Sequence, residues 1–182
     1  NAVLNESHSI CFNETANLDA SGSSDADRES LKYTWDFGDG TVAEGGAKMS
    51  HKYNKGGEYP VSVIVDDKKG TPCSCDKATS LVRVNMPPVA DAGPNLVCCS
   101  GVESYFDGSG SSDPDGDSLS YAWDFGDGTK GEGTRVSHVY TKNGKYTVTL
   151  TVDDGSGKSC SSAKSSFQAI VNEKPTSVIE VK

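Results

Sequence analysis

The sequence lacks the features that mark a membrane protein, a nucleic-acid-binding protein or an enzyme with a common motif. No stretch of about 18 apolar residues is present, which predicts no insertion into a membrane. Acidic residues outnumber basic ones by 26 to 17, so the chain lacks the basic face that binds nucleic acids. It also contains no nucleophile elbow, GxGxxG fingerprint, P-loop or HExxH motif. We therefore expect neither catalysis nor an organic cofactor.

The 182 residues contain one segment that occurs twice with small changes. The segment at Leu18–Thr41 reads LDASGSSDADRESLKYTWDFGDGT. A similar segment follows at an offset of 88, at Phe106–Thr129, and reads FDGSGSSDPDGDSLSYAWDFGDGT. Such a period predicts tandem domains rather than a solenoid, whose repeats run to about 20–50 residues. We place the first repeat at 1–85 and the second repeat at 86–172, with a stiff proline pair at the joint. Residues 173–182 form a C-terminal tail.

Each repeat has the pattern of a β protein, and no stretch of ten residues shows a helical period. Apolar and small polar residues alternate in Tyr59–Val65 and in Tyr146–Val152, which predicts strands with one buried face. Glycine–aspartate–glycine turns follow similar alternation at Gly38–Gly40 and Gly126–Gly128. About seven short strands per repeat predict an all-β fold of two tandem immunoglobulin-like β-sandwiches.

The repeated motif carries a family resemblance. WDFGDG at Trp35–Gly40 and at Trp123–Gly128, preceded by SGSSD and followed by GxY before an alternating strand, resembles the PKD domain. The resemblance implies an immunoglobulin-like sandwich that serves as an extracellular spacer, an adhesion unit or an accessory module of secreted proteases and glycosidases. The tryptophan that opens each motif is predicted to lie in the core. The second repeat has the family's opening at Pro88–Gly93, whereas Asn1–Asn5 lacks proline and glycine, so the first strand of the first repeat is expected to be atypical or absent.

Acidic loops are the candidate metal site. Two loops of a sandwich meet at the same end, and here both carry aspartates, whose mutual repulsion a hard, oxygen-seeking Ca²⁺ would relieve. The candidate ligands are Asp25, Asp27, Asp66 and Asp67 in the first repeat and Asp113, Asp115, Asp117, Asp153 and Asp154 in the second. The alternative is that these side chains close turns by bonding their own backbone. A glycosidase pair is not favoured, because one member of such a pair needs an apolar pocket and these loops are rich in glycine and serine.

Six cysteines without CxxC spacing favour disulfides and hence secretion. Matching positions in the repeats predict two bonds, Cys11–Cys73 and Cys99–Cys160. Cys75 and Cys98 have no such match and could bond each other, bond another chain or stay free. Two acceptor patterns, at Asn5 and Asn13, predict N-glycans.

The tail resembles the entry to a third repeat. Its residues Ser177, Val178, Ile179, Glu180 and Val181 predict a short strand. Three interpretations stay open: the chain is part of a longer array, the tail folds back or stays disordered, or it docks into the first repeat of another copy. The third would build a head-to-tail filament by strand addition.

These observations favour a non-catalytic extracellular protein, either a spacer or a filament subunit. Its expected partners are copies of itself or neighbouring domains of a longer chain. The alternative is an accessory module of a secreted hydrolase that holds a polysaccharide or a fibrous protein. That function needs an exposed aromatic platform. Tyr53, Tyr105 and Tyr140 are its candidates, although their positions favour core or edge.

Overall fold

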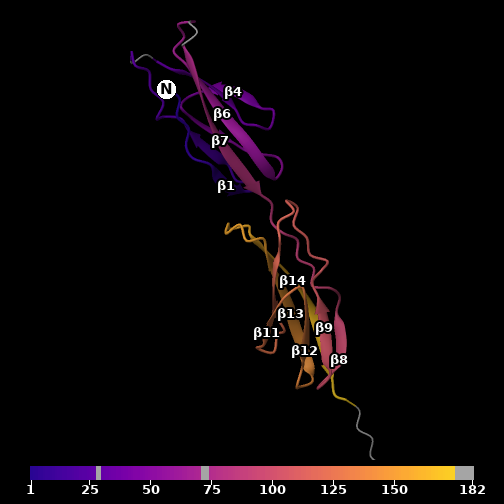
Figure 1. Cartoon of the computed structure of the whole chain (residues 1–182). Coiled ribbons are helices and arrows are strands. Elements are labelled where there is room, and N and C mark those ends of the chain that lie inside the picture. The colour runs from indigo at the N-terminus through magenta and orange to yellow at the C-terminus, as the bar shows by residue number, and fades with distance from the viewer. Residues whose placement is uncertain (28–29, 71–73, 175–182) are drawn as a thin grey trace, which may run out of the picture. The chain divides into compact units, whose positions relative to one another are not determined.

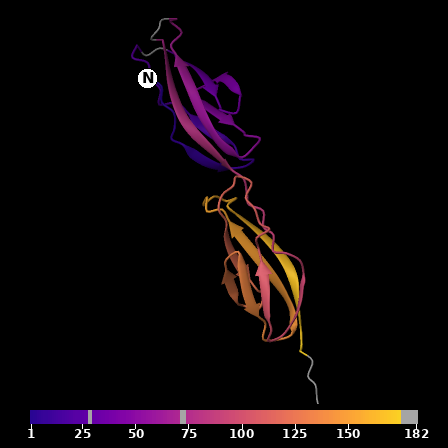
Figure 2. The same ribbon diagram turned by 45° about the vertical axis from the view of Figure 1, so that its right-hand side comes forward.

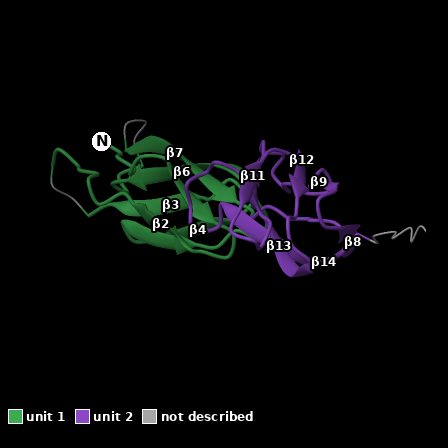
Figure 3. Cartoon of the chain, turned by 90° about the horizontal axis from the view of Figure 1, so that it is seen from below, with its two compact units in different colours: residues 1–86 green, residues 87–182 purple. Residues whose placement is uncertain are grey.

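The computed structural model describes residues 1–27, 30–70 and 74–174, which contain strands and no helix (Figure 1). The chain divides into two compact units, residues 1–86 and 87–182 (Figure 3). The strands of the first repeat are β1 (His8–Cys11), β2 (Ala16–Asp19), β3 (Lys32–Asp36), β4 (Val42–Gly45), β5 (Lys48–His51), β6 (Gly57–Asp66) and β7 (Cys75–Asn85). Those of the second are β8 (Leu96–Cys99), β9 (Glu103–Asp107), β10 (Ser120–Asp124), β11 (Lys130–Glu132), β12 (Arg135–Val139), β13 (Gly144–Asp153) and β14 (Ser162–Asn172).

Both repeats have the same sheet topology, which confirms the predicted tandem sandwiches (Figures 1 and 2). One layer of the first repeat has the strand order β1-β7-β6-β3-β4, and the corresponding layer of the second is β8-β14-β13-β10-β11. The other layer is a two-stranded ladder, β2–β5 or β9–β12. Within the large layer only β1 with β7 and β8 with β14 run parallel.

Strand alternation fills the core of each sandwich as the sequence predicts. In β13, Val148, Leu150 and Val152 are fully buried, while the residues between them are more exposed. Trp35 and Trp123 are 0% and 1% exposed, so their predicted place in the core is confirmed. Each indole nitrogen donates a hydrogen bond to a backbone carbonyl, at 3.1 Å and 3.0 Å, which satisfies the polar atom that burial would otherwise leave unpaired.

The opening segment of the first repeat forms no strand at residues 1–7, as expected, whereas Val89 in the opening of the second repeat forms a β-bridge with Ser112. The segment nevertheless lies in the equivalent place in the domain. Val3 N donates to Ser23 Oγ at 3.0 Å, just as Asp91 N donates to Ser111 Oγ at 2.9 Å in the second repeat. Ala2 and Leu4 pack against the core of the first repeat. These contacts use backbone groups and apolar side chains, so they do not require the proline and glycine of the second repeat. The position at which a donated strand would add is therefore already filled by residues 1–4.

Candidate functional sites

The acidic loops of the second repeat meet at one end of its sandwich, because Ser120 at the start of β10 pairs with Asp153 at the end of β13. Their carboxylates hold their own loops. Asp113 Oδ1 accepts hydrogen bonds from the backbone of Asp115 at 2.8 Å and Asp117 at 3.3 Å. Asp153 and Asp154 each accept one from the backbone two residues further on. The turn-closing role therefore applies to this loop set.

The first repeat closes its loops in the same way. Asp25, Asp66 and Asp67 each accept a backbone hydrogen bond from the residue two positions later, at 2.7–2.9 Å. An additional contact links the two loops here, since Lys69 Nζ lies 3.6 Å from Asp27 Oδ2. An ammonium group thus supplies positive charge between the loops of this repeat.

Calcium binding stays a prediction. Among the residues that the structure describes, no group of three or more His, Cys, Asp or Glu is arranged to hold a metal. In the second repeat, however, Asp113 Oδ2 and Ser156 Oγ are buried without a hydrogen-bond partner. Ser156 occupies the position that Lys69 has in the first repeat. The second repeat therefore has unpaired oxygens, which suit a hard cation, where the first has an ammonium group.

The cysteines do not pair as predicted in the second repeat. Cys99 carries a free thiol, as do Cys75 and Cys98. Cys11 and Cys160 are disulfide-bonded. The predicted Cys99–Cys160 bond is therefore wrong.

Strand register explains why Cys99 and Cys160 do not form a disulfide. Cys99 lies opposite Asn172 at the end of β14, whereas Cys160 precedes the first residue of β14. The strand between these ends is about 33 Å long, at about 3.3 Å per residue, and a disulfide requires Cα atoms within about 7 Å. Cys73 lies outside the described residues. Because Cys75, Cys98 and Cys99 are free, a Cys11–Cys73 bond would leave the disulfide-bonded Cys160 without a partner in the chain, which counts against the predicted Cys11–Cys73 bond. Cys11 lies opposite Asn85, at the other end of β7 from Cys75, which weighs against that bond.

The two glycosylation candidates differ in their surroundings. Asn5 Nδ2 donates to Asn17 O at 3.4 Å, and its Oδ1 accepts from Asp19 N at 3.0 Å, so this amide ties the opening segment to β2. Asn13 is exposed in the turn between β1 and β2, with a φ of +70°. A glycan replaces one of the two Nδ2 hydrogens, so modification of Asn5 would place the sugar beside an amide that already bonds Asn17 O. Both glycans stay predictions.

A His–Asp pair in each repeat was not foreseen from the sequence. Nε2 of His51 lies 2.7 Å from Asp39 Oδ2, and Nε2 of His138 lies 2.8 Å from Asp127 Oδ2. The His138 ring stacks on Phe125 with centroids 4.3 Å apart. Each pair joins a DFGDG turn to the other layer of its own sandwich, which favours a supporting role. A signal was present, since a histidine two residues before a tyrosine occurs in both repeats.

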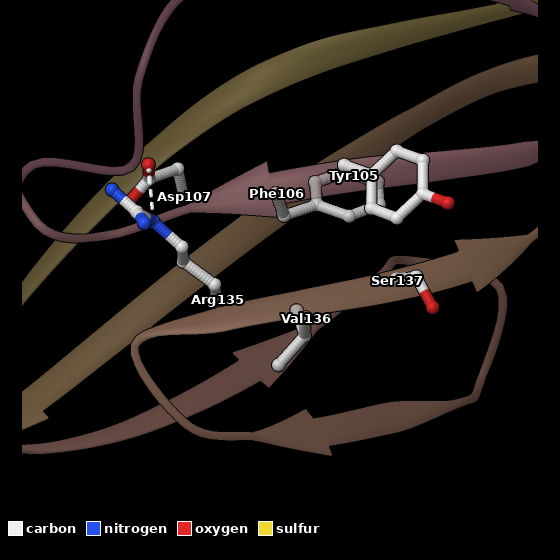
Figure 4. A pocket seen from close by; sticks show the side chains of 6 residues that line it. All are labelled: Tyr105, Phe106, Asp107, Arg135, Val136 and Ser137. Atoms are coloured by element: carbon white, nitrogen blue, oxygen red, sulfur yellow. Dashed lines mark hydrogen bonds and ion pairs between the residues drawn. The ribbon is translucent and has the colours of Figure 1, made fainter.

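The candidate aromatic platform reduces to one residue. Tyr53 and Tyr140 are buried, and their hydroxyls donate to backbone carbonyls of Phe37 and Phe125 at 3.0 Å. Tyr105 on β9 is 75% exposed. It lines a hollow of about 410 Å³ over the β9–β12 ladder, in which the Asp107–Arg135 ion pair lies at the opposite end (Figure 4).

Two further expectations concern membranes and the tail. No helix long and apolar enough to cross a membrane occurs among residues 1–27, 30–70 and 74–174. The predicted strand at 177–181 lies outside the described residues.

Comparisons with known proteins agree with this architecture. The PKD domain family profile matches residues 1–82 and 85–169. Collagenase ColA of Clostridium perfringens (strain 13 / Type A) is 34% identical over 131 residues, which are 72% of this chain and 11% of the collagenase. Pre-pro-metalloprotease PrtV of Vibrio cholerae (serotype O1, strain M66-2) is 51% identical over 49 residues, 27% of this chain and 5% of that protein. The I-band fragment I67-I69 from titin is 14% identical with a TM-score of 0.57, covering 94% of this chain and 65% of the fragment.

The likeness to titin shows the fold alone, which is a tandem pair of immunoglobulin-like β-sandwiches. The repeated WDFGDG turns and the family profile are more specific. The chain belongs to the PKD domain family, with one domain in each repeat. It spans only 11% and 5% of the two bacterial relatives.

Proposed function

We propose that this PKD pair is a non-catalytic accessory module of a longer extracellular protein and attaches that protein to an insoluble polymer. The observation that carries the proposal is the match to small parts of a collagenase and a metalloprotease, since the matched segments are only 11% and 5% of those proteins. A domain that accounts for so little of a protease is an accessory to its chemistry.

The described side chains support a binding role over a catalytic one. The His–Asp pairs occur in both repeats and contact a turn of their own domain. The hydroxyl of Thr129 lies 3.5 Å from His138 Nε2, but it donates its hydrogen bond to Asp127 Oδ1 at 2.6 Å and so closes the same turn. The exposed aromatic residue Tyr105 has instead the position expected of a binding surface.

A filament subunit is the second candidate, and the structure supports it less. Strand addition needs an open position in the first repeat, and residues 1–4 already occupy the expected one. Negative-stain electron microscopy of the untreated protein tests this candidate. We expect single particles, and regular filaments would favour the polymer over the accessory module.

Cosedimentation tests the accessory function directly. The chain is mixed with collagen fibrils, chitin or microcrystalline cellulose and centrifuged. We expect the protein in the pellet with at least one of these polymers, with serum albumin as the control for trapping. Recovery in the supernatant with all of them would contradict the proposal.

A further inference from the structure

The outer face of the β9–β12 ladder carries side chains that the core does not use. Its outward positions, which we name the tyrosine face, are Glu103, Tyr105 and Asp107 on β9 and Arg135, Ser137 and Val139 on β12. Since all six are exposed on two paired strands, this face is a rigid surface rather than a loop.

The ring of Tyr105 is held in place although it is exposed. Its hydroxyl donates to Glu103 Oε2 at 2.9 Å, and Ser137 Oγ donates to Glu103 Oε1 at 2.8 Å. These hydrogen bonds lower the pKa of Glu103, with the bond from Ser137 contributing most, so the carboxylate stays ionised. An oriented aromatic ring loses little conformational freedom when a ligand stacks on it.

Concave surface lies on both sides of this ring. The hollow of about 410 Å³ extends from Tyr105 and Ser137 to the Asp107–Arg135 pair (Figure 4). A second hollow, of about 200 Å³, lies toward residues 92–96 and shares Tyr105, Phe106 and Asp107 with the first. Tyr105 therefore stands between two depressions, which an extended polymer could follow across β9.

We propose that the tyrosine face binds a neutral polysaccharide, with one pyranose ring stacked on Tyr105 and its hydroxyls bonded to Asp107 and Arg135. This inference rests on the proposed accessory function and names its ligand class. A pyranose has an apolar C–H face for the aromatic ring and hydroxyls that both donate and accept hydrogen bonds. The ion pair, at 2.8 Å, presents an acceptor and a donor together.

Charge and hydrogen-bond capacity distinguish this ligand from other polymers. The face has two carboxylates against one guanidinium, and the chain carries a net charge of -9, so an acidic polysaccharide would be repelled. A proline-rich polypeptide offers few N–H donors, because proline has none, and could therefore make few hydrogen bonds to the carboxylates of this face. A neutral sugar satisfies both conditions.

The first repeat supplies a matched control. At the position of Tyr105 it has Asn17, whose Oδ1 accepts from Ser50 Oγ at 2.9 Å. The neighbouring ion pair is kept, as Lys48 Nζ lies 2.8 Å from Asp19 Oδ2. The two faces therefore share the ion pair, while the first repeat lacks the aromatic ring and has Thr15 and Lys52 at the positions of Glu103 and Val139.

The experiment measures binding isotherms of the whole chain on insoluble chitin and cellulose, with collagen fibrils as the protein polymer. We expect Tyr105→Ala to bind the polysaccharide about tenfold more weakly, which is the size of a surface aromatic contact. Asn17→Ala is the matched control and should bind as the unmodified chain does. Tyr105→Phe keeps the ring and should retain most of the binding. Melting temperatures verify that the variants fold.

Each outcome decides the matter. Loss of polysaccharide binding in Tyr105→Ala alone supports the proposal. Equal binding by Tyr105→Ala and the unmodified chain overturns it. Binding to collagen fibrils but to neither polysaccharide also overturns it, while the accessory function stands. Binding to none of the three polymers overturns both.

Discussion

The DFGDG turn depends on a glycine that lies against a neighbouring strand. Gly126 has a φ of +79°, and a Cβ there would lie 2.5 Å from Thr147 O. Gly128 has a φ of +92° but open space around it. The two positions therefore separate backbone strain from steric contact within one turn.

This difference gives a stability prediction. Gly128→Ala should lower the free energy of unfolding by about 1–2 kcal/mol, the cost of a left-handed conformation. Gly126→Ala should lower it by a further ~1–3 kcal/mol, because the backbone of β13 must move. Urea denaturation of both variants checks the order. Equal destabilisation would show that the close contact has no role.

The His–Asp pair beside the same turn predicts loss of stability in acid. Burial raises the pKa of Asp127, but hydrogen bonds from Thr129 and His138 lower it by more, so the net pKa lies below its usual value. A lowered carboxyl pKa stabilises the fold above about pH 4, and that stabilisation is lost as the pH falls through the lowered value. Melting curves from pH 6 to pH 2 should therefore fall less steeply for Asp127→Asn than for the control Asp124→Asn. Parallel curves would contradict this origin.

Single residues were predictable from the sequence where strand alternation governs them. Trp35 and Trp123 follow from that pattern, because alternate residues of a strand point to one face. The partner of Asp127 could not be found in this way, since His138 comes from the other layer of the sandwich and only the folded register brings the two together.

At the scale of elements, the length of β14 determines which cysteines can come within disulfide-bonding distance. Its eleven residues keep Cys99 and Cys160 at opposite ends of the sheet. We expect a maleimide to label Cys99 in the native, non-reduced protein and to leave Cys160 unmodified, because Cys160 is disulfide-bonded. Peptide mapping by mass spectrometry reads this out. A peptide pair that joins Cys99 to Cys160 would refute the register argument.

The loops at one end of each sandwich differ in how their acidic charge is compensated. We propose that calcium binds this end of the second repeat, where Ser156 replaces the Lys69 of the first. Chelation should then lower the melting temperature, since free calcium at about 100 times its dissociation constant adds about 2.7 kcal/mol of stability.

A variant that introduces a positive charge at the proposed site also tests calcium binding. Ser156→Lys should remove the effect of the chelator on the melting temperature, because an ammonium group takes the place of the ion. Lys69→Ser in the first repeat is the reciprocal variant and should create or strengthen calcium sensitivity. A melt of the unmodified chain that EDTA leaves unchanged would contradict calcium binding.

The strands themselves follow from alternation and turn glycines, whereas the opening segment of the first repeat does not. Residues 1–4 hold their place through hydrogen bonds of their backbone groups and through the apolar side chains of Ala2 and Leu4. Backbone bonding leaves little trace in residue identity, so the sequence does not reveal that this segment still contacts its domain.

For the whole molecule, the net charge of -9 would make binding to a charged ligand depend on salt, whereas binding to a neutral ligand should not. If stacking and hydrogen bonds carry the affinity for a neutral polymer, then raising the ionic strength should change it little, since screening acts on charged pairs. Binding isotherms on chitin at low and high sodium chloride test this. A steep loss of affinity with salt would point to a charged ligand instead.

The two repeats have equivalent outward positions on their strands, and packing of the core does not determine which residues occupy them. Tyr105 and Asn17 occupy equivalent outward positions, and each sandwich has its own hydrophobic core beneath them. The surface chemistry of one domain can therefore be rewritten without redesigning its fold. Exchanging Tyr105 with Asn17 and Glu103 with Thr15 should move recognition from one repeat to the other, so the duplicated chain is also a scaffold for grafting new specificities.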